Sequence, residues 1–263
     1  MMTSAISDLS PGDHRPVRGR RYLFLPPAGG TLCTLRGIGR SVRGADVRGV
    51  EYPGRGGRLL TPLPGTVEEL AEQIAREILG EFGPCSVPRT VLAGFSMGAF
   101  VAFEVAQRIH AWHGAAPAAV VVVGACAPQR RVPGGFARTD AAALGRLLDR
   151  NGLTPVVGYR EHPEAWEYAL DLLRGDLRLM GAYRGPAEVP LPCPVAALCG
   201  SDDRAFGTVD DATGAWRRWT TGRFFSAVVP GGHLGLLDAG REAEFWRWMH
   251  RIEAATEQED DDA

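Results

Sequence analysis

Residues 90–98 read Thr-Val-Leu-Ala-Gly-Phe-Ser-Met-Gly. The apolar start of this stretch predicts a buried strand, and residues 99–108 beyond it predict a helix. A serine between two glycines at such a junction is typical of a nucleophile held on a tight, strained turn. Gly94 and Gly98 leave room for the turn because glycine has no side chain. The stretch therefore predicts a strand–turn–helix unit that presents the Ser96 hydroxyl as a reacting group.

Segments of strand length alternate with segments of helical periodicity along most of the chain. This alternation predicts an α/β fold with a mostly parallel central sheet flanked by helices. A length of 263 residues fits a single domain, 1–263. We expect strands at 21–26, 46–52, 90–93, 118–123, 194–199 and 224–229, and helices at 31–42, 67–82, 99–108, 210–219 and 241–253.

Residues 128–190 interrupt the alternation with two helical stretches, 140–150 and 163–183. One interpretation is a helical insertion that packs on the core. We favour a lid over the reacting group, because ligand sites in open α/β sheets lie beyond the carboxyl ends of the strands. We expect residues 1–19 and the acidic tail 256–263 to be flexible. The second helical stretch is amphipathic, with one face formed by Trp166, Leu170, Leu173, Leu177 and Met180.

The charged residues exclude several kinds of chemistry. All 29 basic residues are arginines, and with 31 acidic residues the formal net charge is −2. This balance gives no electrostatic reason to expect nucleic acid or a membrane surface as a partner. A sequence without lysine excludes Schiff-base chemistry and a Walker-A phosphate clamp. The start lacks the apolar core of a signal peptide and no run of 18 apolar residues occurs, so we expect neither secretion nor a membrane span.

The cysteines and histidines indicate neither disulfides nor a metal. Five cysteines are scattered along the chain without a Cys-x-x-Cys pair, which fits reduced thiols in a cytoplasmic protein. His110 and His113 lie three positions apart, but no cysteine or acidic cluster accompanies them. We expect these histidines to face solvent, and we expect no metal or other cofactor.

Two fragments further along support a reactive serine over an ordinary Gly/Ser turn. A serine needs a base to accept its proton, and the base needs a carboxylate to orient it. In α/β-hydrolases the three residues follow in the order serine, acid, histidine. Residues 199–203, Cys-Gly-Ser-Asp-Asp, and 230–233, Pro-Gly-Gly-His, each follow an expected strand. The catalytic residues expected are Ser96, His233 and either Asp202 or Asp203, of which Asp203 is favoured because it lies three positions after Gly200.

The developing negative charge on a substrate oxygen would need backbone N–H donors. In this fold one donor is the residue after the nucleophile, which is Met97, and the other lies in the loop after the first strand. That loop reads Pro-Pro-Ala-Gly-Gly over residues 26–30. Proline has no N–H, so Ala28 is the first available donor. A plain strand–helix turn is the alternative interpretation of this loop.

Four segments together resemble the type II thioesterases, the discrete editing enzymes of polyketide and nonribosomal-peptide assembly lines. They are Leu25–Gly30, Tyr52–Arg55, Gly94–Ala99 and Gly231–His233, and the similarity runs from about residue 20 to residue 250. Tyr-Pro-Gly-Arg is the most discriminating segment, because generic hydrolases do not carry it. The resemblance implies hydrolysis of acyl groups from the phosphopantetheine arm of an acyl carrier protein. It also implies a role in antibiotic biosynthesis by polyketide or nonribosomal-peptide assembly lines.

Three positions depart from the pattern of that family. Histidine is usual where this chain has Phe95, histidine or an aromatic residue where it has Pro27, and proline where it has Arg204. We expect these changes at the rim of the site, where they affect the choice of acyl group more than the activity.

Other functions are compatible with the same three residues. A general serine esterase would act without a carrier protein, and an acyltransferase or cyclase would pass the acyl group to a nucleophile other than water. A non-enzymatic binding protein on this fold is disfavoured, because such proteins usually lose one of the three residues. We expect a monomer. A carrier could dock on arginines near the insertion, such as Arg130, Arg131, Arg138 or Arg160, although a solvated face is the simpler interpretation.

Overall fold

The computed structural model of the chain describes residues 4–9, 19–40, 45–129, 141–150, 162–186, 189–203 and 213–257. Within these residues, seven strands form one sheet in the order β1-β3-β2-β4-β5-β6-β7. Each neighbouring pair is parallel except β1 and β3, which are antiparallel. The expectation of a mostly parallel sheet is confirmed. The strands are β1 Ile6–Asp8, β2 Arg21–Leu25, β3 Asp46–Val50, β4 Thr90–Phe95, β5 Ala119–Val123, β6 Val195–Gly200 and β7 Phe224–Val229.

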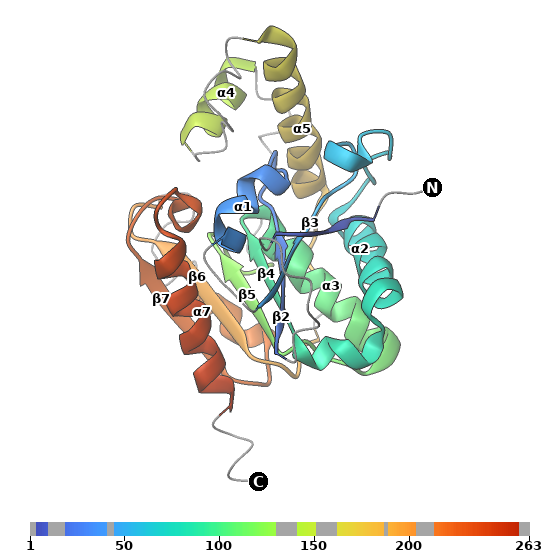
Figure 1. Cartoon of the computed structure of the whole chain (residues 1–263), viewed down its shortest axis with the longest axis vertical. Helices are drawn as coiled ribbons and strands as arrows, with labels where there is room; N and C mark the ends of the chain where they lie inside the picture. The colour runs from blue at the N-terminus through green and yellow to red at the C-terminus, as the bar shows by residue number, and fades with distance from the viewer. Residues whose placement is uncertain are drawn as a thin grey trace.

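Helices cover both faces of the sheet. Figure 1 shows α1 and α7 on one face and α2 with α3 on the other. The described helices are α1 Leu32–Arg40, α2 Val67–Phe82, α3 Met97–His113, α4 Ala141–Arg150, α5 Pro163–Ala182 and α7 Glu242–Glu257. Short 3-10 turns are η1 Gly56–Arg58, η2 Pro84–Arg89, η5 Gly214–Trp219 and η6 Gly235–Leu237. None of the described helices is long and apolar enough to cross a membrane.

Two segments differ from what the sequence predicts. Strand β1 lies within the stretch 1–19 that we expected to be flexible, and it pairs with β3 at the edge of the sheet. Three residues are too few to show strand periodicity. The helix expected at 210–219 is a 3-10 turn over its described part, where Trp216 and Trp219 are both buried. A 3-10 helix has three residues per turn, so side chains three positions apart lie on the same face. The 3-10 turn therefore allows both tryptophans to be buried, which explains why the segment is not an α-helix.

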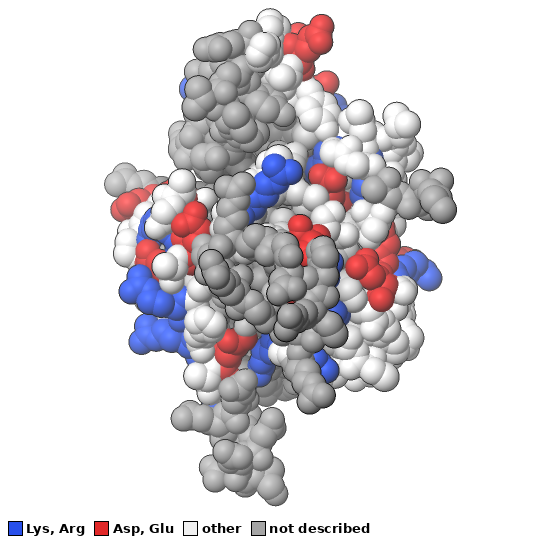
Figure 2. All heavy atoms as spheres, viewed as in Figure 1, with Lys and Arg blue, Asp and Glu red and all other residues white. Residues whose placement is uncertain are grey.

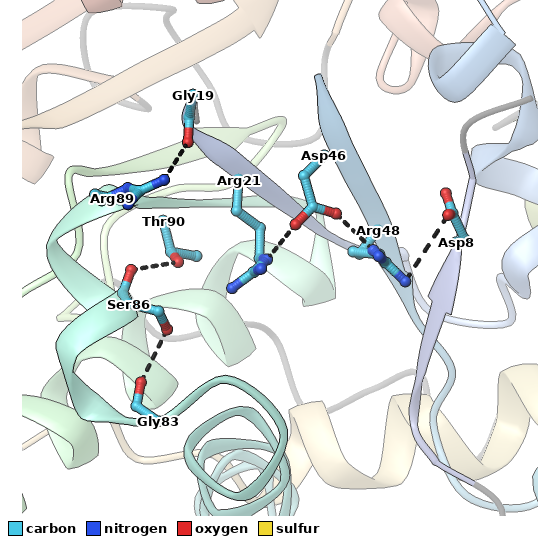
Figure 3. Close-up of polar contacts among 9 residues, drawn as sticks. All are labelled: Asp8, Gly19, Arg21, Asp46, Arg48, Gly83, Ser86, Arg89 and Thr90. Atoms are coloured by element: carbon cyan, nitrogen blue, oxygen red, sulfur yellow. Dashed lines mark hydrogen bonds and ion pairs between the residues drawn. The ribbon is translucent and has the colours of Figure 1, made fainter. Parts of the chain in front are cut away.

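An ion-pair cluster ties together the amino ends of β2 and β3. Arg21 and Asp46 begin these strands and are partners in the register. The Arg21 Nε donates to one Asp46 oxygen and the Arg48 Nε donates to the other, each at 2.6 Å, and Asp8 lies 3.9 Å from Arg48 (Figure 3). Burial alone would raise the pKa of the Asp46 carboxyl, but the hydrogen bonds from Arg48 and Arg21 outweigh burial and lower it.

The inserted helices α4 and α5 lie together beyond one end of the sheet (Figure 1). They approach closely because Gly145 on α4 has no side chain, so that a β-carbon there would lie 2.8 Å from the ring of Trp166. Four residues of the expected apolar face of α5 are buried, namely Leu170, Leu173, Leu177 and Met180. On the face shown in Figure 2, acidic and basic side chains of the described residues are interspersed.

Candidate active site

Ser96 occupies a strained turn between β4 and α3. Its backbone angles are φ 52° and ψ −113°, and among the described residues it is the only non-glycine residue with positive φ. The Ser96 N–H donates to the Val123 carbonyl at 2.8 Å, which fixes the turn to the end of β5. A β-carbon on Gly94 would lie 2.5 Å from the Ala99 nitrogen. Strain of this kind concentrates at functional sites, where the surrounding structure enforces it.

His233 reaches Ser96 from the loop after β7. The distance from His233 Nε2 to Ser96 Oγ is 2.9 Å. Gly124, at φ +61° after β5, makes room for this loop, because a β-carbon on Gly124 would lie 2.7 Å from the His233 carbonyl oxygen. Two residues 137 positions apart in sequence are thus joined by a single hydrogen bond.

Asp203 reaches the other side of the His233 ring from the loop after β6. Its Oδ2 lies 2.8 Å from His233 Nδ1, and its side chain is almost fully buried. Asp202 is exposed, and its N–H donates to the Gly231 carbonyl at 2.9 Å. The two adjacent acids therefore differ in place: Asp203 contacts His233, whereas the Asp202 backbone joins the loop after β6 to the loop after β7.

The loop over residues 26–30 lies against the amino end of α3. A β-carbon on Gly98 would lie 2.6 Å from the Pro26 carbonyl oxygen, so this approach requires glycine. Both Ala28 and Met97 are buried. In the described part of the chain, their backbone N–H groups donate to no protein acceptor. Within the described residues, two N–H donors without a protein partner thus lie on adjoining segments, one of which begins directly after Ser96.

A serine, a histidine and an aspartate in one hydrogen-bonded series are characteristic of acyl-transferring hydrolases. A model of the thioesterase domain family matches residues 21–252 of the chain. The chain belongs to this thioesterase family. It is 34% identical over 224 residues to the protein named "Probable cadicidin biosynthesis thioesterase" of Streptomyces griseus, a match that covers 83% of this chain and 60% of the relative. It is 31% identical over 234 residues to Thioesterase PikA5 of Streptomyces venezuelae, covering 86% and 79%.

Among solved structures, the chain resembles the type II thioesterase BorB from the borrelidin biosynthetic cluster. The TM-score is 0.80 at 29% sequence identity, and the match covers 96% of this chain and 99% of that one. The fold is therefore of the α/β-hydrolase type, as the sequence predicts. The chain spans less than two thirds of the length of the cadicidin relative.

The Tyr52–Arg55 segment holds the loop 26–30. The Tyr52 hydroxyl donates to the Pro26 carbonyl at 3.1 Å, and Arg55 Nη1 donates to the Gly30 carbonyl at 2.9 Å. Both side chains are fully buried, and burial raises the pKa of the Tyr52 phenol well above its ordinary value, so the phenol remains a donor. The sequence distinguishes this segment only by its resemblance to a family, and its contacts with the loop could not be predicted from that.

Two further residues near the site are not predicted by the sequence patterns. Asp176 on α5 is fully buried and binds both Arg55 and the Gly29 N–H. The Cys199 thiol lies 4.0 Å from Asp203 Oδ2, the oxygen that contacts His233. Burial, with the Asp203 charge as a smaller cause, raises the pKa of Cys199 to about 11. The thiol is therefore protonated at neutral pH and adds no charge beside the carboxylate.

One position that departs from the family pattern, Phe95, is not at the rim of the site where we expected it. Phe95 is fully buried and packs between Phe24 and Phe245, with ring centroids 6.4 and 5.8 Å away. Its side chain extends toward the face of the sheet that α7 covers, away from the expected rim. Pro27 is also buried. Arg204 lies outside the described residues, as do Arg130, Arg131, Arg138 and Arg160.

No cluster of three histidine, cysteine or acidic side chains that could hold a metal ion occurs among the described residues. His113 is exposed, as expected for a solvent-facing histidine. His110 is only half-buried overall, but its Nδ1 is buried and has no hydrogen-bond partner in the described part of the chain.

Proposed function

We propose that the protein is a type II editing thioesterase, which hydrolyses acyl groups from the phosphopantetheine arm of acyl carrier proteins and so removes aberrant or stalled units in polyketide or nonribosomal-peptide biosynthesis. The observation that carries this proposal is the hydrogen-bonded series Ser96–His233–Asp203, with distances of 2.9 and 2.8 Å. Membership of the thioesterase family and the likeness to a type II thioesterase support the same function. The alternative is a general serine esterase, or an acyltransferase or cyclase.

In the first half of the reaction, the Ser96 oxygen attacks the thioester carbonyl carbon while its proton passes to His233 Nε2. Asp203 accepts a hydrogen bond from His233 Nδ1 and stabilises the positive ring. The carbonyl oxygen becomes an oxyanion, which accepts hydrogen bonds from the Ala28 and Met97 N–H groups. The carbon–sulfur bond then breaks, and the phosphopantetheine thiol leaves with the proton from His233.

In the second half, His233 takes a proton from a water molecule, whose oxygen attacks the acyl carbon. The same two N–H groups stabilise the second oxyanion, and Ser96 leaves with the proton from His233. The products are the free acid and the regenerated enzyme. The lysine-free chain uses no Schiff base, and this reaction needs no metal or other cofactor.

We propose that residues 1–263 form a single domain and that the insertion at 128–190 is a lid over the active site. Helices α4 and α5 lie beyond one end of the sheet, and α5 contacts the loop 26–30 through Asp176. A carrier-bound acyl chain would enter beneath this lid. We propose a cytoplasmic monomer whose partners are carrier-protein domains, with neither nucleic acid nor membrane as a partner.

Release of free acid from short acyl groups on a phosphopantetheinyl carrier protein tests the proposal. Wild type, Ser96→Ala and Ser226→Ala are compared, and an oxygen ester of the same acyl group is the second substrate. Ser226 lies exposed on β7 and serves as the matched serine control. We expect turnover of the carrier thioester by wild type and Ser226→Ala, and a loss of about 10³-fold or more in Ser96→Ala.

The two substrates distinguish the alternatives. Turnover of the oxygen ester alone would identify a general esterase. Acyl transfer to an added amine or alcohol, with little free acid formed, would identify a transferase or cyclase. Silence of wild type on both substrates would contradict the proposed function.

A further inference from the structure

Arg55 and Asp176 form a fully buried ion pair beside the candidate active site. Arg55 Nη2 donates to Asp176 Oδ1 at 2.6 Å, and Nη1 donates to Oδ2 at 2.8 Å. The two side chains have no exposed surface. Burial by itself would lower the pKa of Arg55, but the charge and hydrogen bonds of Asp176 raise it overall, so the guanidinium remains charged.

Stability alone does not account for a pair at this position. Replacing a buried ion pair by apolar side chains of similar volume is often neutral or stabilising, because desolvation offsets the attraction. This pair is also imperfectly satisfied, since the buried Arg55 Nε has no hydrogen-bond partner among the residues that the structure describes. The pair does provide something that apolar side chains could not, namely hydrogen bonds to the backbone of another segment.

That segment is the loop over residues 26–30. Asp176 Oδ2 accepts from the Gly29 N–H at 2.7 Å, and Arg55 Nη1 donates to the Gly30 carbonyl at 2.9 Å. The Gly30 N–H donates to the Pro27 carbonyl at 2.9 Å, which closes the turn around Ala28. The ion pair therefore holds the two residues that directly follow Ala28.

The same contacts leave one donor of the loop for a ligand. Pro26 and Pro27 have no N–H, and the N–H groups of Gly29 and Gly30 are engaged. Ala28 is thus the residue of this loop whose N–H has no acceptor in the described part of the chain. An oxyanion donor must lie within about 2.7–3.1 Å of the oxygen, and an error of about 1 Å in position is costly.

We propose that Arg55 and Asp176 are positioning residues, which hold the Ala28 N–H where it stabilises the oxyanion. Asp176 belongs to α5, so the pair also couples the inserted helix to the oxyanion loop. A second contact supports this attachment of α5, because the Tyr168 hydroxyl donates to the Gly54 carbonyl at 3.3 Å. The proposal rests on the proposed thioesterase function.

The first test compares kcat and KM of wild type, Asp176→Asn and Arg55→Lys on the acyl-carrier substrate. Complete loss of one oxyanion donor costs about 10²–10³ in kcat, so a displaced donor is expected to cost about 10–100-fold. KM is expected to change by less than about threefold, because the lost interaction forms only in the transition state.

The second test measures the inhibition constant of a boronic acid, which would not change if Arg55 and Asp176 had only a structural role. The Ser96 oxygen adds to boron, its proton passes to His233, and a boron-bound oxygen takes the place of the oxyanion. We expect the inhibition constant to rise in Asp176→Asn and Arg55→Lys by about the factor by which kcat/KM falls. Inhibition constants equal to wild type would overturn the proposal.

The matched control is a second ion pair that does not contact the loop. Arg58 Nη2 donates to Glu77 Oε1 at 2.8 Å, and Arg58 is also nearly buried. Arg58→Lys and Glu77→Gln are expected to reduce stability to urea while kcat stays within about twofold of wild type. Equal losses of kcat in the control and test variants would overturn the proposal, because they would reflect general loosening.

If the ion-pair variants do not fold, Tyr52→Phe tests the same proposal about the position of the Ala28 N–H. This change retains the ring and removes the hydroxyl that donates to the Pro26 carbonyl, on the other side of Ala28. We expect a severalfold lower kcat with a parallel loss of boronic acid affinity. Wild-type values for both would overturn the proposal. Absence of hydrolysis by the wild type would instead contradict the proposed function, so the two failures are distinguishable.

Discussion

The carbonyl oxygen of Leu25 occupies the space that a β-carbon on Gly98 would need. This contact joins the end of β2 to the first turn of α3, and it brings the loop 26–30 against the helix that follows Ser96. The Pro26 carbonyl oxygen lies 2.6 Å from the same position. Both neighbours are backbone, which cannot rotate aside as a flexible side chain can.

Gly98→Ala is therefore expected to separate the loop from α3. We predict a loss of stability of about 1–3 kcal/mol, typical of overpacking a core, and a larger relative loss of thioesterase activity. Urea denaturation and kcat on the carrier thioester measure the two effects. Wild-type kcat in this variant would contradict the proposed placement of the Ala28 donor.

Gly80→Ala is the control for a glycine that nothing crowds. Gly80 lies in α2, is exposed, and has no atom within 4 Å of a β-carbon placed on it. Alanine is the better helix former, so the change is expected to stabilise the protein by about 0.5–1 kcal/mol without affecting activity. The same urea titration measures this change in the free energy of unfolding. A loss of stability would contradict the finding that no atom lies close to the added β-carbon.

Asp203→Asn is expected to reduce kcat by about 10³–10⁴-fold, because an amide favours the wrong tautomer of His233. The neighbouring Asp202→Asn is the matched control, since its backbone contact with Gly231 does not involve the carboxylate. We expect its kcat to stay within about twofold of wild type. Steady-state kinetics of the two variants distinguish the acids, and the opposite ranking would assign the role to Asp202.

Glu104→Gln is expected to change how stability depends on pH. Glu104 on α3 is buried; burial raises the pKa of its carboxyl although Arg108 and the Tyr183 hydroxyl bind it. A raised pKa in the folded state means that wild type loses stability as the pH rises from about 4.5 through that pKa. The amide of the variant does not titrate, so the variant has no such dependence. Urea titrations from pH 4 to pH 7 should show the variant gaining stability relative to wild type, and a flat difference would contradict the shift.

The five cysteines are expected to fall into two reactivity classes. Cys33 and Cys85 are exposed, whereas Cys126, Cys193 and Cys199 are buried. Burial raises the pKa of Cys193 to about 12 and that of Cys199 to about 11. At pH 8 about one Cys199 thiol in a thousand is then a thiolate, the reactive form.

A thiol-disulfide reagent at pH 8 should therefore label two cysteines rapidly in the native protein and all five after denaturation. The double variant Cys33→Ser, Cys85→Ser should lose the rapid phase. A rapid phase that persists in that variant would mean that a buried thiol is accessible.

The parts of the structure that could be predicted from the sequence are those with local causes. The unit from β4 to α3 is contiguous, and its apolar residues, glycines and helical periodicity lie within about twenty-four positions. Helix α2 has the predicted bounds because Thr66 Oγ1 accepts from the Glu69 N–H at its start and Gly83, at φ +71°, ends it. His233 was predicted because it follows a strand in the order that the fold requires.

One residue that the sequence patterns did not reveal, Asp176, acts over a long separation in the sequence. Asp176 binds an arginine 121 positions away, which no local pattern encodes. A signal was nevertheless present: Asp176 lies three positions after Leu173 and four before Met180, on the apolar face of α5. An acid on such a face needs a buried partner. Phe95 was misplaced because the orientation of its side chain depends on which helix covers that face of the sheet.

The Arg21–Asp46–Arg48 cluster lies at the amino ends of β2 and β3, whereas Ser96, Asp203 and His233 follow the carboxyl ends of their strands. In a parallel sheet these are opposite edges. A protein engineer thus has two independent regions: sequence changes, reporter fusions or attachment to a support can be directed to the amino edge, while libraries that alter substrate scope are confined to the loops of the carboxyl edge.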